Sequence, residues 1–101
     1  LTEIVSVGNN SSPVSSFRLY QNYPNPFNPE TNISFYLDKN TDVKLSLYDA
    51  SGKLIRPLQE GFFTAGDYSL RVNLQDLQSG VYFYSLETKD GTLTQKMILI
   101  K

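Results

Sequence analysis

Along most of the chain, apolar and polar residues alternate with a period of two. In the segment TNISFYLD, residues 31–38, Ile33, Phe35 and Leu37 share one face of an extended chain, and the residues between them share the other. This alternation is typical of a β-strand that buries one face. The other segments that we expect to form strands are 43–49, 53–58, 68–74, 81–89 and 93–101.

Short polar segments with strong turn signals separate these strands. In DASG, residues 49–52, Asp49 can accept hydrogen bonds from its own downstream backbone, and Gly52 can adopt a positive φ. Pro57 lacks an amide donor, so the strand over 53–58 is expected to lie at a sheet edge or to end there.

The spacing of strands and turns indicates an all-β fold. No segment has a helical period, and turns recur about every eight to twelve residues, which favours an antiparallel β-sandwich. We expect about seven strands in an Ig-like arrangement. The segment VYFYSLETK, residues 81–89, has apolar residues on both faces, which predicts a central strand buried on both sides.

The N-terminal part of the chain has a different composition. The segment GNNSSPVSS, residues 8–16, consists mainly of small polar residues, which is typical of a flexible linker. We therefore assign residues 1–16 to the end of a preceding region and its linker, and residues 17–101 to the β-sandwich domain. Because the chain starts without Met and without a basic n-region, we expect a fragment of a longer protein rather than a signal peptide.

A proline-rich segment, YPNPFNPE, precedes the strand over 31–38. Pro24, Pro26 and Pro29 push the residues before them toward extended conformations. They also remove three amide donors, so the segment is predicted not to pair cleanly with a sheet. We expect a stiff strap that leads into the next strand, with Phe27 inserted into the core.

Composition and charge exclude several classes of function. The chain has 101 residues, one domain's worth, with 9 basic and 10 acidic residues scattered along it and a net charge of −1. With the charges balanced and scattered in this way, the sequence predicts no basic patch that would bind nucleic acid or an anionic membrane. There is no Cys, which excludes disulfides, and no His, which removes the commonest general base and metal ligand. No apolar run approaches the ~18 residues of a membrane span.

The remaining polar residues do not predict an active site. The aspartates lie nearly all in turns, where Asp commonly accepts backbone hydrogen bonds. We therefore predict a protein that is not an enzyme, with no metal site and no cofactor. Outward-facing aromatic residues leave a carbohydrate-binding module open as an alternative, because Tyr36 and Tyr48 are expected on the outward faces of two adjacent strands. Such tyrosines also serve as amphipathic packing residues.

Five segments, taken together and in this order, resemble a known family. They are YPNPFNPETNISFYL, VKLSLYDASGKLI, TAGDYSL, LQSGVYFYSLET and TQKMILIK. The chain is similar over about residues 20–101 to the type A C-terminal sorting domain of the type IX secretion system, found in Bacteroidetes and related phyla. That family's domain ends at the C-terminus of its protein, as this chain does at Lys101.

The resemblance implies a non-enzymatic Ig-like β-sandwich that acts as an address for export. It implies that translocon or shuttle proteins recognise the folded domain, and that a surface sortase removes it from a cargo attached in cis. The cargo would pass through the periplasm and end secreted or attached to the cell surface. No nucleic-acid partner and no direct membrane insertion are expected, and the domain is expected to be a monomer.

The resemblance also carries over individual residues. The recognition residues that it implies are Pro24, Asn25, Pro26, Gly80, Tyr82, Lys96, Met97, Leu99 and Lys101. The residues that it implies for the cleavage linker are Gly8, Asn9, Asn10, Ser11 and Ser12. The chain departs from many relatives in one place, since VNLQDLQSG stands where they have Trp-Asp and a longer glycine-rich loop.

The last strand suggests how an address could be recognised. The apolar run MILI, residues 97–100, would promote aggregation if its edge were free, and Lys96 and Lys101 flank it. One hypothesis is that a partner adds a strand to this exposed edge. The alternative is that the strand serves only the core. Two rivals to the sorting role also stay open, a carbohydrate-binding module of a secreted polysaccharide-degrading enzyme and an Ig-like structural spacer.

Overall fold

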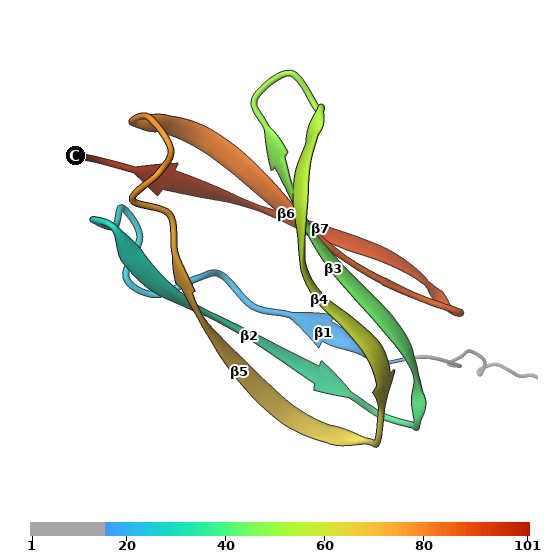
Figure 1. Cartoon of the computed structure of the whole chain (residues 1–101). Helices are drawn as coiled ribbons and strands as arrows, with labels where there is room; N and C mark the ends of the chain where they lie inside the picture. Colours follow the sequence, from blue (N-terminus) through green and yellow to red (C-terminus); the bar gives the residue numbers. More distant parts are fainter. Residues whose placement is uncertain (1–15) are drawn as a thin grey trace, which may run out of the picture.

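Two antiparallel β-sheets face each other in the computed structural model, which describes residues 16–101 (Figure 1). One sheet has the strand order β1-β2-β5 and the other β4-β3-β6-β7. The strands are β1 (Arg18–Leu19), β2 (Glu30–Leu37), β3 (Thr41–Asp49), β4 (Leu54–Phe63), β5 (Gly66–Asn73), β6 (Gly80–Thr88) and β7 (Gly91–Leu99). The predicted all-β sandwich of about seven strands is confirmed. Within the described residues, no helix is long and apolar enough to cross a membrane.

The core lies between the sheets and is built from the inward positions of the alternating segments. In β2 the side chains of Ile33, Phe35 and Leu37 are buried, as the period of two predicted. Burial of each such side chain contributes about 1.5–3 kcal/mol to folding. The other buried apolar residues are Leu19, Phe27, Val43, Leu45, Leu47, Val72, Leu74, Tyr82, Tyr84, Leu86, Met97 and Leu99.

Tyr84 is the largest fully buried side chain, and it joins the two sheets. Its hydroxyl donates a hydrogen bond of 2.7 Å to the backbone C=O of Tyr20, which follows β1. Because burial disfavours the charged phenolate, the pKa of Tyr84 is raised to about 12. The neutral hydroxyl thus fastens the start of the domain to the centre of the larger sheet.

Strand β4 is an edge strand, as Pro57 predicted, but it does not end there. It continues to Phe63, and its pairing with β3 shifts register between Leu45 and Ser46, beside Pro57. A bulge at an edge tolerates a residue without an amide donor, because the ladder is already interrupted. The strand therefore extends beyond the predicted 53–58 segment.

Strand β6 is central in its sheet, between β3 and β7, but only one of its faces is buried. The prediction that both faces are buried is wrong, since Val81 is 37% exposed and Phe83 is half-buried. No element among residues 16–101 covers this outer face. Phe83 lies opposite Tyr48 and Val81 opposite Ile98, so the apolar side chains on this face lie beside one another.

Candidate recognition surface

The proline-rich segment, residues 22–29, which we call the strap, lies along the outer edge of β7. The N–H of Phe27 donates to the C=O of Ile98 at 3.0 Å, and the N–H of Ile100 donates to the C=O of Phe27 at 2.9 Å. The prediction that this segment does not pair with a sheet is therefore wrong at Phe27, which forms a parallel bridge with Leu99, and at Tyr23, which forms an antiparallel bridge with Asn32 of β2. The neighbouring prolines lack donors, but Phe27 keeps its own N–H and C=O.

Phe27 also inserts its ring into the core, as predicted, and is only 3% exposed. Its backbone holds the strap to β7 while its side chain packs between the sheets. A single residue thus provides both the pairing and the apolar anchor for the strap.

Asn25 completes the cover of the β7 edge. Its side-chain Oδ1 accepts a hydrogen bond of 2.9 Å from the N–H of Ile98. Nearby, Nε2 of Gln21 donates to the C=O of Lys96 at 2.7 Å. The hypothesis that a partner finds this edge exposed is therefore wrong at the Ile98–Ile100 end, because the chain's own strap already occupies it.

A buried polar cluster fixes the bend of the strap. The C=O of Pro24 accepts hydrogen bonds from Nδ2 of Asn22 at 3.1 Å and from Oγ1 of Thr31 at 2.8 Å. Asn22 and Thr31 also bond each other at 2.9 Å, and both are almost fully buried. Buried polar groups that satisfy one another hold a specific geometry. The sequence analysis did not identify Asn22, because no periodic pattern marks it.

The start of β6 meets the end of β7 at the same end of the molecule. Gly80 lies opposite Leu99, and Tyr82 lies opposite Met97. The ring of Tyr82 is buried, while its hydroxyl donates to the C=O of Gln78 at 2.6 Å. Tyr82 thus joins the connection before β6 to the core.

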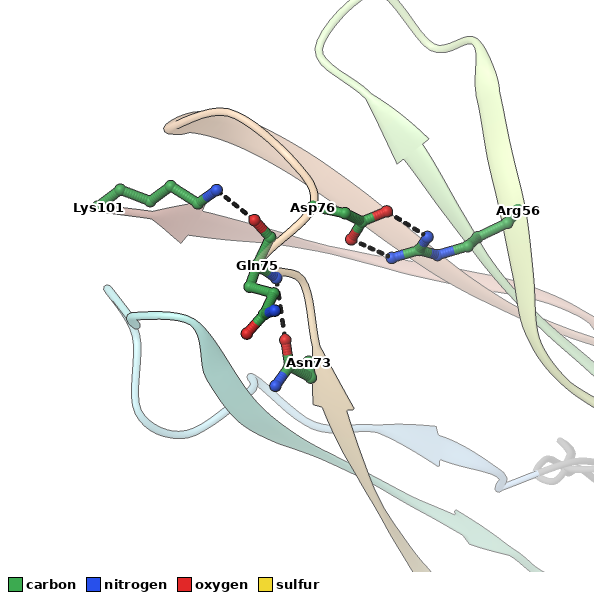
Figure 2. Close-up of polar contacts among 5 residues, drawn as sticks. All are labelled: Arg56, Asn73, Gln75, Asp76 and Lys101. Atoms are coloured by element: carbon green, nitrogen blue, oxygen red, sulfur yellow. Dashed lines mark hydrogen bonds and ion pairs between the residues drawn. The ribbon is translucent and has the colours of Figure 1, made fainter.

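Lys101 contacts the connection between β5 and β6. Its N–H donates to Oγ of Ser79 at 2.9 Å, and its Nζ donates to the C=O of Gln75. Figure 2 shows that the connection is also held from the other side, where Arg56 of β4 meets Asp76. At the start of this connection, the side chain of Asn73, the last residue of β5, accepts a hydrogen bond from the N–H of Gln75 at 2.9 Å.

The contact between Arg56 and Asp76 is a bidentate ion pair. Nη1 and Nη2 of Arg56 lie 2.8 and 3.1 Å from the two carboxylate oxygens of Asp76. The hydrogen bond from Arg56 lowers the pKa of Asp76 and raises that of Arg56. Both side chains are exposed, so the pair contributes little to stability and serves mainly to hold the connection in place.

The residues implied by the family resemblance divide into accessible and buried ones. Met97 and Leu99 are almost fully buried, so their side chains pack the core and do not face solvent. Lys96 is exposed on the outer face of its sheet. Six residues with exposed side chains lie in the first part of the strap and directly after β7: Tyr23, Pro24, Asn25, Pro26, Ile100 and Lys101. We call these six residues the convergent surface.

Tyr36 and Tyr48 do not form a platform for a sugar ring. Tyr36 belongs to β2 and Tyr48 to β3, and these strands lie in different sheets of the sandwich. Consecutive strands need not be neighbours in a sandwich, because the chain can cross from one sheet to the other. The two outward side chains therefore lie on different sheets and do not make one surface.

The structure contains the predicted turn cap at Asp49. Oδ1 of Asp49 accepts hydrogen bonds from the N–H groups of Ser51 and Lys53, and Gly52 has a φ of 89°. The side-chain hydrogen bond from Ser51 lowers the pKa of Asp49.

Among residues 16–101, no three His, Cys, Asp or Glu side chains gather as a metal site would require. The proposed cleavage residues Gly8–Ser12 lie outside the described residues.

Comparison with known proteins gives one family. The model of the secretion system C-terminal sorting domain matches residues 21–101, which include the strap and every strand from β2 to β7. No curated protein matches the chain.

Proposed function

Because the chain belongs to the family of type IX secretion system C-terminal sorting domains, we propose that it directs a cargo protein across the outer membrane. The cargo is the polypeptide joined in cis before residue 17. The cargo passes through the periplasm and is then released or attached to the cell surface. The domain itself carries out no chemistry.

The convergent surface is the part of the domain that we propose the secretion machinery recognises. The observation that carries this proposal is the pairing of the strap with β7, which brings together segments about 70 residues apart in sequence. Asn25 and Phe27 contact Ile98 and Ile100 only when the domain is folded. A partner that binds there therefore distinguishes a folded domain from an unfolded one, which suits an address that is recognised after folding.

We further propose the partners and the cleavage step from the family resemblance. A translocon or shuttle protein binds the convergent surface, and a surface sortase cleaves within Gly8, Asn9, Asn10, Ser11 and Ser12. These small polar residues can fit an extended protease site. Lys96 lies on a separate face and forms no part of the convergent surface.

An export assay tests the sorting role. All 101 residues are fused to the C-terminus of a fluorescent protein with an ordinary signal peptide, in a host with a type IX system and in its translocon-deficient mutant. We expect fluorescence outside the first strain and in the periplasm of the second. Equal periplasmic retention in both strains, with the fusion folded and intact, would contradict the proposal.

Two variants test the surface. Lys101→Ala removes the contacts of one exposed side chain in the convergent surface, and Lys89→Ala removes an exposed lysine at the β6–β7 turn. We expect Lys101→Ala to reduce export and Lys89→Ala to leave it unchanged, with equal thermal stability for both folded domains. Export unaffected by Lys101→Ala and by Asn25→Ala would place recognition elsewhere on the domain.

A further inference from the structure

The side of the sandwich opposite the strap is open. Among the described residues, β4 pairs only with β3, and β5 pairs only with β2. The two strands are consecutive and connect through the short turn at 64–65, so both outer edges border the same side of the molecule (Figure 1). We call the space between these edges the β4–β5 groove.

The β4–β5 groove is hollowed at two places, where apolar side chains line it together with polar ones. A cavity of about 350 Å³ at one end is lined by Leu58, Leu70 and Val72, among others. A second cavity of about 160 Å³ is lined by Phe63 and Tyr68, and it shares Leu70 with the first. The two hollows therefore meet at Leu70. Leu58, Phe63, Tyr68 and Leu70 are only partly buried, so they keep apolar surface that a further side chain can cover.

The backbone of β5 offers unused hydrogen-bonding groups along this groove. The N–H of Leu74 donates toward β2, to the C=O of Pro29, and neighbouring residues of a strand point to opposite sides. The N–H and C=O groups of Ser69 and Arg71 therefore point away from β2, toward the groove. Within residues 16–101, no backbone group pairs with them. An added strand could satisfy them.

Charge favours an acidic residue of an added strand opposite Arg71, whereas Asp67, exposed on the same outward face of β5, disfavours an acidic residue opposite itself. The groove contains two arginines, of which Arg56 already holds Asp76 in a bidentate pair. Arg71 lies at the groove and is exposed, and no carboxylate among the described residues lies within ion-pair distance of it. A carboxylate of a partner can meet this guanidinium with two parallel hydrogen bonds.

The register of β5 then specifies the pattern of the partner. Even-numbered residues of β5, such as Leu70 and Val72, face the core side, and odd-numbered residues, such as Arg71, face outward. An added strand alternates in the same way, because opposite residues of paired strands lie on the same face. We propose that the β4–β5 groove binds an extended peptide, with apolar residues at alternate positions and an acidic residue opposite Arg71, by strand addition to β5. This inference does not depend on the sorting role.

The experiment is an amide NMR titration of the full 101-residue chain. The probe, named the valine–glutamate peptide, is a capped ten-residue peptide in which valine alternates with threonine and one central threonine is replaced by glutamate. The control probe, named the valine–lysine peptide, has lysine in place of that glutamate. We expect the valine–glutamate peptide to shift the amide signals of Ser69 and Arg71, and the valine–lysine peptide to bind about tenfold more weakly or not at all. Shifts confined to β7, or equal binding of both peptides, would overturn the proposal.

Two variants separate charge from backbone pairing. Arg71→Glu should weaken binding of the valine–glutamate peptide by about tenfold or more, while Lys89→Glu, a matched charge reversal away from the groove, should leave it unchanged. Ser69→Pro removes an outward N–H that β2 does not use, so the fold should persist and binding should weaken. Binding unaltered by both Arg71→Glu and Ser69→Pro would contradict strand addition at β5.

Discussion

The two sides of this sandwich treat their strand edges in opposite ways. On one side, which we call the closed side, the strap lies against β7. There Asn25 and Phe27 form hydrogen bonds with the outward backbone groups of Ile98 and Ile100. On the other side, which we call the open side, β4 and β5 both have an outer edge without a neighbouring strand among residues 16–101. The contrast shows what the proline-rich segment does, since a stiff segment in which only Phe27 forms a backbone bridge with β7 covers that edge without extending the sheet.

The difference also separates two kinds of recognition. The closed side presents side chains of the strap and of Lys101, over a backbone that is already paired. The open side presents backbone groups and a groove that is lined partly by apolar side chains, beside Arg71. A partner of the closed side must therefore bind a folded surface, whereas a partner of the open side can add a strand.

The largest expected difference is between two phenylalanines. Phe27 is 3% exposed on the closed side, and Phe62 is 65% exposed on β4. We expect Phe27→Ala to lower the free energy of unfolding by about 3–5 kcal/mol, because it leaves a cavity in the core. Phe62→Ala should change it by less than about 0.5 kcal/mol. Chemical denaturation of both variants measures this, and similar losses would mean that the strap is not anchored by Phe27.

The next effect concerns Tyr84, which holds the closed side to the larger sheet. Its pKa is raised to about 12 in the folded state, against 10.0 for an ordinary tyrosine. Between these values the unfolded chain releases the proton and the folded chain keeps it, so rising pH favours unfolding. We expect full stability below about pH 10, and a loss of about 2–3 kcal/mol by about pH 12.

Denaturation curves at increasing pH measure this loss. Tyr84→Phe has no hydroxyl to titrate and provides the control. That variant should be less stable at neutral pH, because the C=O of Tyr20 loses its partner. It should also lose less stability than the parent chain as the pH rises above about 10. If the variant lost stability as steeply as the parent chain, the raised pKa would not be responsible.

A smaller effect is expected at Asn25. Asn25→Ala leaves the N–H of Ile98 without its acceptor and should cost about 1 kcal/mol. Asn40 makes a comparable contact near the open side, where its Oδ1 accepts from the N–H of Ala65 at 2.8 Å. Asn40→Ala therefore provides the matched control. Only Asn25→Ala should speed the hydrogen exchange of the Ile98 amide, and equal exchange in both variants would argue against the contact.

The smallest effect is expected for the ion pair of the open side. Since Arg56 lowers the pKa of Asp76, the stability that this pair provides is present above the ordinary pKa of 3.8 and is lost as pH falls through the folded value. In Arg56→Ala, this part of the loss of stability at acid pH should disappear. Arg71→Ala, which removes an arginine without an ion pair in the described residues, should keep it. Thermal melts at neutral pH and below the ordinary pKa measure the difference.

Local patterns predicted the elements well, because the period of two reports directly which face of a strand is buried. The inward residues of β2 and β3, the edge position of Pro57 and the insertion of Phe27 all follow from local physical chemistry. Strand β1 was missed, since two residues are too short to show a period. The sorting family was identified from five segments whose order no single pattern explains, and the family match bears this out.

Contacts between distant segments could not be predicted in the same way. Nothing near Asn25 in the sequence indicates that its side chain meets Ile98, and the prolines argued against pairing at Phe27. The sheet to which each strand belongs was equally hidden, so Tyr36 and Tyr48 were expected side by side. For β6, apolar residues on both faces suggested full burial, whereas the outer ones contact only their neighbours within the sheet.

Both proposals depend on one claim, that the chain closes one side of its own sandwich and leaves the other open. Native-state hydrogen exchange of the full chain tests it most directly, because exchange reports which amides are held in hydrogen bonds. The amides of Phe27 and Ile98 should be strongly protected, and those of Ser69 and Arg71 should exchange almost as fast as in an unstructured chain. Rapid exchange at Phe27 and Ile98, or strong protection at Ser69 and Arg71, would contradict the claim.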